Sequence, residues 1–249
     1  MRKKLTFEIL PQPDNTTCGP TCLHALYRYY GDNVSLAQVI AEVPALTGGG
    51  TLAVMLANHA LDRGYRATIY TYNLIIFDPT WFSPGVDIAS RLAQRRSVIH
   101  SAKQKKAIDA YLKFIQSGGR LQFEDLTRGL LRRFLKSDRP ILSGLNSTFL
   151  YRAVRSNPQT QKDDDIGGEV DGHFVVLSGY DRENRTVHIS DPYSENPYSE
   201  NPRANRGYDL PIDRVMGAVL LGVLTYDANF LIIEPNPKEP NLKRKANFI

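Results

Sequence analysis

Two cysteines stand four residues apart near the start of the chain, in surroundings that differ chemically. Cys18 follows Thr16 and Thr17 and begins a segment with helical spacing, so it is expected at a helix N-terminus. Unpaired N–H groups and the positive end of the helix dipole favour a thiolate there, and the thiolate is the nucleophilic form of cysteine. Cys22 lies one turn further along among apolar residues, which is typical of a packed small side chain. We therefore expect Cys18 to be a nucleophile and Cys22 to be buried.

The two cysteines do not fit the other common uses of this residue. They are too few for a disulfide framework. Their spacing lacks the second Cys or His pair of a structural zinc site, and His24 lies too close in the sequence to complete one. The sequence therefore implies no metal and no cofactor, and leaves thiol chemistry or packing.

A cysteine nucleophile needs a histidine base that the fold, rather than the sequence, brings close. The chain offers five histidines: His24, His59, His100, His173 and His188. The first two lie in predicted helices and the third at a helix boundary, where packing or surface roles are common. The last two lie on residues 173–180 and 186–189, two β-rich runs joined by turn residues, which predict a hairpin.

The register of this hairpin separates its two histidines. With residues 181–185 as the loop, Tyr180 faces Thr186, and His173 becomes a diagonal neighbour of Asp191 on one face of the sheet. His188 is three residues from Asp191 and points to the other face. We expect His173 to be the base and Asp191 to orient its ring. The alternatives are a strand-edge histidine bonded to a carbonyl and a plain Asp-Pro turn.

Acyl transfer also needs donors for the negative oxygen that develops on the attacked carbonyl. Gln12 lies six residues before Cys18, in an extended segment that leads to the predicted helix. Its side-chain amide and the backbone N–H of Cys18 are expected to form this oxyanion hole. The alternative is an exposed loop glutamine.

Helical patterns come first along the chain and strands mostly later. Helices are predicted over residues 18–30, 35–42, 51–63 and 125–136, with a mainly helical insertion over about 73–120; strands are predicted over residues 65–72, 140–145, 173–180, 186–189, 216–224 and 229–234. This order favours the α+β class, with N-terminal helices packed on a mainly antiparallel sheet.

The bulk properties are those of one globular domain. The 249 residues carry a net charge of +5 and have 42% apolar residues. We expect one domain over residues 1–235 and a loose basic tail over residues 236–249. No run reaches the roughly 18 apolar residues of a membrane span, and the basic N-terminus lacks the apolar core of a signal peptide, so a cytoplasmic location is expected. The basic residues accompany no nucleic-acid-binding motif, which makes nucleic acid an unfavoured partner.

A short duplication follows Asp191. The sequence Pro-Tyr-Ser-Glu-Asn occurs twice in succession over residues 192–201. Two copies of five residues do not make a repeat architecture, so the duplication is interpreted as a feature of one loop.

Three blocks of the sequence together resemble the C39 peptidases and C39-like proteins. The segment Gln12-Pro-Asp-Asn-Thr-Thr-Cys18-Gly-Pro-Thr-Cys-Leu is similar to the opening of that family. Residues 130–141 resemble its helix-to-strand step, and Gly172-His173-Phe-Val-Val-Leu followed by Asp191-Pro192-Tyr193 resembles its His and Asp-Pro blocks. The insertion over about 73–120 has no counterpart in the resemblance.

The resemblance implies a papain-like fold and a thiol hydrolase that acts on a peptide or protein substrate. Gln12, Cys18, His173 and Asp191 then correspond to the oxyanion glutamine, nucleophile, base and orienter of the family. Its best-known members clip double-glycine leader peptides while fused to an ABC transporter, but this sequence shows neither membrane spans nor an ATPase domain, so that substrate does not follow.

Other functions use the same residues. An acyl or peptidyl transferase would use the same thiol, and a non-catalytic peptide-binding module would keep only the pocket. The presence of suitable residues at all four positions favours the enzyme, because a binding module has no need of the cysteine.

Overall fold

One eight-stranded sheet runs through the structure, a computed structural model that describes residues 2–198 and 206–237. The strand order is β3-β2-β8-β4-β5-β6-β7, and β1 pairs with one end of β5. Among the described strands, β2 and β3 form the only parallel pair. The strands are β1 Arg2–Lys4, β2 Tyr65–Thr71, β3 Arg120–Gln122, β4 Ile141–Asn146, β5 Gly172–Asp181, β6 Thr186–Ser190, β7 Gly207–Pro211 and β8 Asn229–Pro235.

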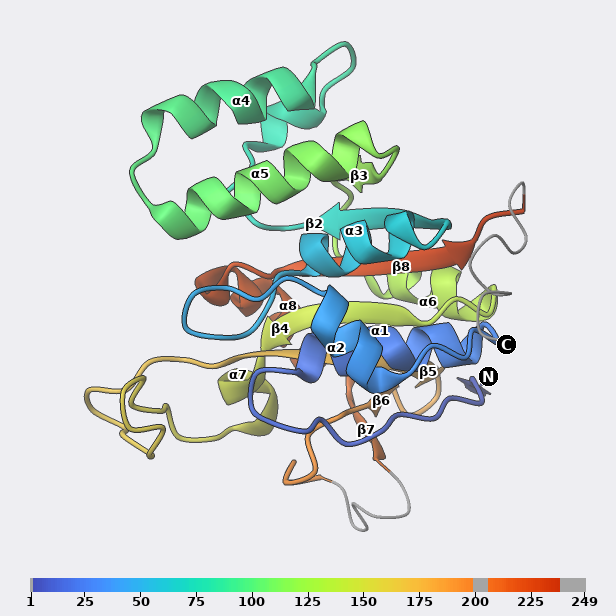
Figure 1. The fold of residues 1–249 in the computed structure, drawn as a ribbon. Helices are drawn as coiled ribbons and strands as arrows, with labels where there is room; N and C mark the ends of the chain where they lie inside the picture. Colours follow the sequence, from blue (N-terminus) through green and yellow to red (C-terminus); the bar gives the residue numbers. More distant parts are fainter. Residues whose placement is uncertain (1, 199–205, 238–249) are drawn as a thin grey trace.

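Helices cover both faces of this sheet (Figure 1). They are α1 Cys18–Tyr29, α2 Leu36–Glu42, α3 Ala53–Asp62, α4 Ile88–Val98, α5 Ala102–Gln116, α6 Arg128–Lys136, α7 Ser147–Tyr151 and α8 Ile212–Leu221, with 3₁₀ turns η1 Pro79–Phe82 and η2 Gly222–Thr225. Side chains alternate along a strand, so Val176 packs with α1 and α3, whereas Val175 packs with α6, α7 and α8. The predicted α+β class, with N-terminal helices on a mainly antiparallel sheet, is confirmed.

A buried polar network fixes the N-terminal helices to one another. Asp32 accepts two hydrogen bonds of 2.8 Å from the guanidinium of Arg63, and the Tyr65 hydroxyl donates to it at 3.2 Å. The Tyr27 hydroxyl lies 2.7 Å from Nδ1 of His59. These contacts join the C-terminal end of α1 to α3 and β2.

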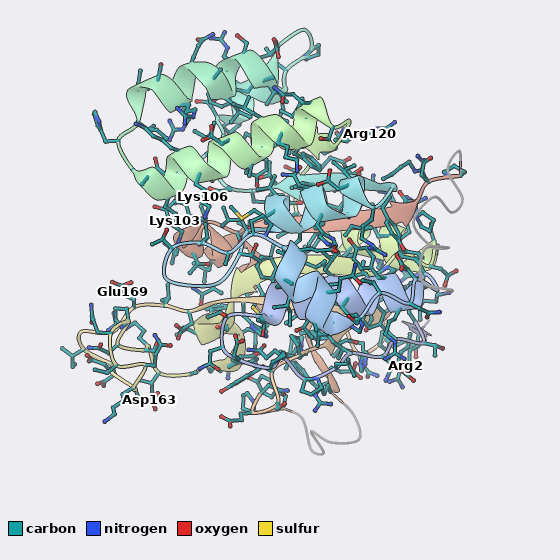
Figure 2. All side chains as sticks on the ribbon, in the orientation of Figure 1. Arg2, Lys103, Lys106, Arg120, Asp163 and Glu169 are labelled. Atoms are coloured by element: carbon teal, nitrogen blue, oxygen red, sulfur yellow. The ribbon has the colours of Figure 1, made fainter. Side chains whose placement is uncertain are left out.

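The helical segment between β2 and β3 lies beyond α3, and lysines of α5 join it to the rest of the protein. Figure 2 shows Lys103 and Lys106 on the side of α5 that faces the rest of the chain. The Nζ atom of Lys106 donates to the Ala45 carbonyl at 2.7 Å, and that of Lys103 lies 4.3 Å from the centre of the Tyr226 ring. The role of this segment stays a prediction.

The predicted strand over residues 216–224 is wrong, because this run forms α8 and η2. It is apolar almost throughout, and periodicity alone does not distinguish a buried strand from a helix in such a run. The helix buries Val215, Ala218 and Val219 against the sheet and exposes Leu220 and Leu221.

The predicted hairpin register is wrong at the turn and right further along. Thr186 pairs with Asp181 instead of Tyr180, which is a slip of one residue. A β-bulge at Ser178 then inserts one residue into β5, so Val176 pairs with Ser190 as the original register requires. The backbone of β1 approaches β5 at this place, where a Cβ on Gly179 would lie 2.8 Å from the Lys3 carbonyl oxygen.

Two further expectations concern membrane-spanning helices and the C-terminal tail. In the part of the chain that the structure describes, every helix is too short or too polar to cross a bilayer. The predicted basic tail, residues 236–249, lies outside the described residues from position 238 onward.

Gly144, on β4, leaves no room for a side chain, so Gly144→Ala is expected to destabilise the protein by about 1–3 kcal/mol. A Cβ there would lie 2.6 Å from Cβ of Asp227, whose carboxylate caps α3 at the Ala53 N–H. Gly129→Ala is the control, because Gly129 is exposed near the start of α6 and should gain up to about 1 kcal/mol. Urea unfolding measures both, and equal stabilities of the two variants would contradict the packing described here.

Candidate active site

A tight turn delivers Cys18 to the first position of α1. The backbone N–H of Thr16 donates to the Asp14 carboxylate at 2.7 Å, and the Asp14 N–H donates to the Thr17 hydroxyl at 3.3 Å. The Thr17 side chain makes no capping hydrogen bond to the first N–H groups of α1. The Cys18 side chain is therefore held at the positive end of a helix that its N-cap side chain does not cap.

Close packing on Phe174 fixes this end of α1 against the start of β5. The buried thiol of Cys22 donates to the Phe174 carbonyl at 3.3 Å. A Cβ on Gly19 would lie 3.2 Å from the Phe174 ring and 2.7 Å from Thr51, so no larger residue fits between α1 and its neighbours. Cys22 is fully buried and burial raises its pKa well above the ordinary value, as expected of a packing residue.

His173 lies one residue before Phe174, hydrogen-bonds Asp191 and interacts electrostatically with Cys18. Its Nε2 is 2.9 Å from Oδ1 of Asp191, so Nδ1 is the ring nitrogen left to interact with the Cys18 side chain. Burial alone would lower the pKa of His173, but the charge of Asp191, the hydrogen bond to it and the neighbouring Cys18 outweigh burial and raise the pKa to about 10. The imidazole is therefore held as a cation at neutral pH.

Asp191 is completely buried, and each of its oxygens accepts two hydrogen bonds. Oδ1 accepts from His173 and from the Tyr193 backbone N–H at 2.9 Å, and Oδ2 accepts from the hydroxyls of Tyr151 and Tyr208 at 2.6 Å each. Burial alone would raise the pKa of Asp191, but His173 and the two hydroxyls hold it below its ordinary value. Sequence reasoning missed both tyrosines.

Gln12 lies beside the same Asp-Pro turn. Its backbone N–H donates to the Pro192 carbonyl at 2.9 Å, and its side-chain amide donates to the Asp14 carbonyl at 2.8 Å. One amide N–H stays available, and the buried Oε1 has no hydrogen-bond partner among the described residues. The structure thus brings Gln12 to the Asp14 turn that leads into Cys18, while its service as an oxyanion donor stays a prediction.

The other histidines take different places. His24 is buried within α1, His100 is exposed, His59 contacts Glu42 and Tyr27, and His188 contacts Asp209 on β7. In residues 2–198 and 206–237, no three His, Cys, Asp or Glu side chains gather in a way that could hold a metal ion.

Comparison with known proteins gives one family and several distant structures. The model of the Peptidase_C39 like family matches residues 4–207. A protein from Bacillus anthracis described as a C39-like peptidase aligns with a TM-score of 0.50 at 12% identity, covering 95% of this chain and 98% of that one, which shows a shared fold. No curated protein sequence matches the chain.

Two further solved structures are similar at lower scores. Xylellain, a cysteine protease from Xylella fastidiosa, has a TM-score of 0.45 at 13% identity. The alignment covers 94% of this chain and 86% of the xylellain chain. A double glycine motif protease from an AMS/PCAT transporter, solved with a leader peptide, has a TM-score of 0.44 at 14% identity. The alignment covers 94% of this chain and 95% of that one.

Alkylation should distinguish the two cysteines in the folded protein. Brief iodoacetamide treatment at neutral pH is expected to modify Cys18 and to spare Cys22, because Cys22 is fully buried and its raised pKa keeps it a thiol. Peptide mass spectrometry measures each site, and denaturant should make both cysteines react. Equal labelling of the two residues before unfolding would contradict this placement.

Proposed function

Because the chain belongs to the Peptidase_C39 like family, we propose that it is a cysteine peptidase that cleaves a peptide or amide bond with Cys18 as nucleophile. The observation that carries the proposal is the position of one buried imidazole. His173 interacts with the Cys18 side chain and also hydrogen-bonds the buried Asp191. Family membership supports peptidase chemistry in general, and this geometry supports the residue roles.

The first half-reaction forms a thioester. The Cys18 sulfur attacks the carbonyl carbon of the scissile bond, and the carbonyl electron pair moves onto oxygen. The Cys18 backbone N–H, with the free amide N–H of Gln12, is assigned to this oxyanion. The imidazolium of His173 then gives its proton to the leaving amine, the C–N bond breaks, and the acyl group stays on sulfur.

The second half-reaction restores the enzyme. His173, now neutral, accepts a proton from water while the water oxygen attacks the thioester. The C–S bond breaks, the acid product leaves, and the thiolate and imidazolium re-form. Asp191 steadies the imidazolium throughout and keeps Nε2 as the donor to its own carboxylate.

The same thioester would react with an amine if one reached it before water, which would make the protein an acyl or peptidyl transferase. Product analysis separates the two reactions, since hydrolysis gives a free carboxylate and transfer gives a new amide. A peptide-binding module without catalysis would give neither product.

Cys18→Ala is expected to abolish cleavage of a proteome-derived peptide library, a loss of about a thousandfold or more, because no other residue of the site supplies a sulfur to the carbonyl. Mass spectrometry of new peptide N-termini measures cleavage. Cys22→Ala should keep the same cleavage pattern and lose about 1 kcal/mol of stability from the small buried cavity. Cleavage by the Cys18→Ala variant at the wild-type sites would overturn the proposal.

The activity is expected to fall as pH rises towards about 10, because His173 loses its proton through that range and can then no longer protonate the leaving amine. Asp191→Asn removes the charge that raises the pKa of His173, so the alkaline fall should move down by about one pH unit or more.

Asp209→Asn is the matched control for this pH measurement. It alters a second His–Asp contact, that of His188, and should leave the alkaline limb where it is. A profile of kcat/KM against pH that coincides for Asp191→Asn and the wild type would show that Asp191 does not act on the base.

A further inference from the structure

Both copies of the tandem Pro-Tyr-Ser-Glu-Asn sequence place their tyrosine against the same residue, Tyr151 on α7. The Tyr193 ring stacks with the Tyr151 ring, with centres 6.2 Å apart and planes 29° apart. The Tyr198 ring lies 6.4 Å from the Tyr151 ring at a steeper angle of 54°. The duplication thus supplies two aromatic contacts to one side chain.

Polar contacts join the first copy to Tyr198 of the second and join Tyr198 to α7. The Asn196 amide donates to the Tyr193 carbonyl at 2.8 Å and accepts from the Tyr198 N–H at 3.2 Å. The Tyr198 hydroxyl lies 3.3 Å from the Tyr151 carbonyl oxygen and accepts a 2.9 Å hydrogen bond from Arg214. The position of the Tyr151 ring therefore depends on the loop as well as on α7.

Tyr151 and Tyr208, which lies on β7, donate to the same acceptor. Both hydroxyls donate to Oδ2 of Asp191 at 2.6 Å, and the Tyr208 ring lies 5.4 Å from that of Tyr198. Burial raises the pKa of both tyrosines well above the ordinary value, so both remain protonated donors across the range in which an enzyme works.

We propose that Tyr151 and Tyr208 are positioning residues that hold the Asp191 carboxylate ionised and directed at the His173 ring, and that residues 192–198 of the tandem sequence hold Tyr151 in place. This inference rests on the proposed function. It also gives a role to the duplicated sequence, which the sequence analysis interpreted only as a feature of one loop.

The two hydroxyls are needed because Oδ2 has no other donor among the described residues. A carboxylate oxygen that is buried without a hydrogen bond is strongly disfavoured, so Asp191 would take up a proton or turn away. Either change removes the fixed charge that keeps the imidazole cationic and oriented. The titratable groups that face the His173–Asp191 pair are Cys18 and Cys22 on α1, Tyr151 on α7, Tyr193 in the loop and Tyr208 on β7.

The test combines Tyr151→Phe, Tyr208→Phe and the double variant, which keep the rings and remove only the hydroxyls. The readout is the low-field proton NMR signal of the His173–Asp191 hydrogen bond, assigned by its absence in His173→Gln. Each single variant should raise by about one pH unit the acid limit at which this signal disappears, because Asp191 then protonates more easily. Each should also lower kcat/KM about tenfold near neutral pH and move its acid limb by the same amount.

Tyr27→Phe is the matched control, since it removes a buried hydroxyl bound to His59 without touching Asp191. It should change stability but neither the NMR acid limit nor the acid limb. Tyr198→Leu tests the loop and should shift the acid limit in the same direction as Tyr151→Phe.

The outcomes are separable from those of the proposed function. An acid limit unchanged in the double variant overturns the positioning role, whatever happens to activity. An acid limit unchanged in Tyr198→Leu overturns the role of the tandem loop. A shifted acid limit in a protein that cleaves no peptide supports the positioning role and refutes the peptidase.

Discussion

The buried charge of Asp191 is the constraint on which the rest of the site depends. An isolated carboxylate in a dry interior costs several kcal/mol, and it persists only where hydrogen bonds replace water. Its four donors come from β5, the loop after β6, α7 and β7, so one side chain draws together segments from residue 151 to residue 208. The ends of these elements are thus fixed by the need to satisfy a single group.

The thiol side of the site depends on backbone packing instead of charge. Cys18 is placed because Gly19 and Cys22 let α1 approach Phe174, the residue next to His173. The position of the sulfur and the position of the imidazole are therefore set by the same short contact between a helix and a strand. If the sulfur and the imidazole were held by unrelated parts of the fold, small displacements in each part would add up and change the distance between them.

The sequence predicted those parts of the site that depend on local chemistry or strand alternation. The position of Cys18 at the start of α1 followed from helical spacing, and the pairing of His173 with Asp191 followed from alternation along a hairpin, while the catalytic roles of these residues stay predictions. The pairing near Asp191 was predicted correctly only because two deviations cancel: the one-residue slip at the turn is offset by the bulge at Ser178. Nothing in the composition of the strand indicates this bulge.

Other parts depend on contacts that a sequence does not display. Tyr151 lies 40 residues from Asp191 along the chain and Tyr208 lies 17, and neither stands in a recognisable motif. The run that became α8 had too uniform a composition for its period to show. The roles of Tyr151 and Tyr208 and the helical form of α8 all depend on which residues are buried against which, and this is known only from the folded structure.

Three histidine–acid contacts in this chain show why the exposure of the acid matters more than the contact itself. His173–Asp191, His59–Glu42 and His188–Asp209 are hydrogen-bonded at 2.9, 2.9 and 2.7 Å, and all three imidazoles are nearly buried. Burial lowers the pKa of His59 and of His188 despite their acids, and nearby cations lower it further. The pKa of His173 is instead raised by Asp191 and, to a smaller extent, by Cys18. The side chains of Glu42 and Asp209 are 44% and 40% exposed, so water screens their charges, but that of Asp191 is 0% exposed. Of these three imidazoles, the one with a raised pKa lies beside the carboxylate that is fully removed from water, and that carboxylate in turn depends on donors such as the two tyrosine hydroxyls.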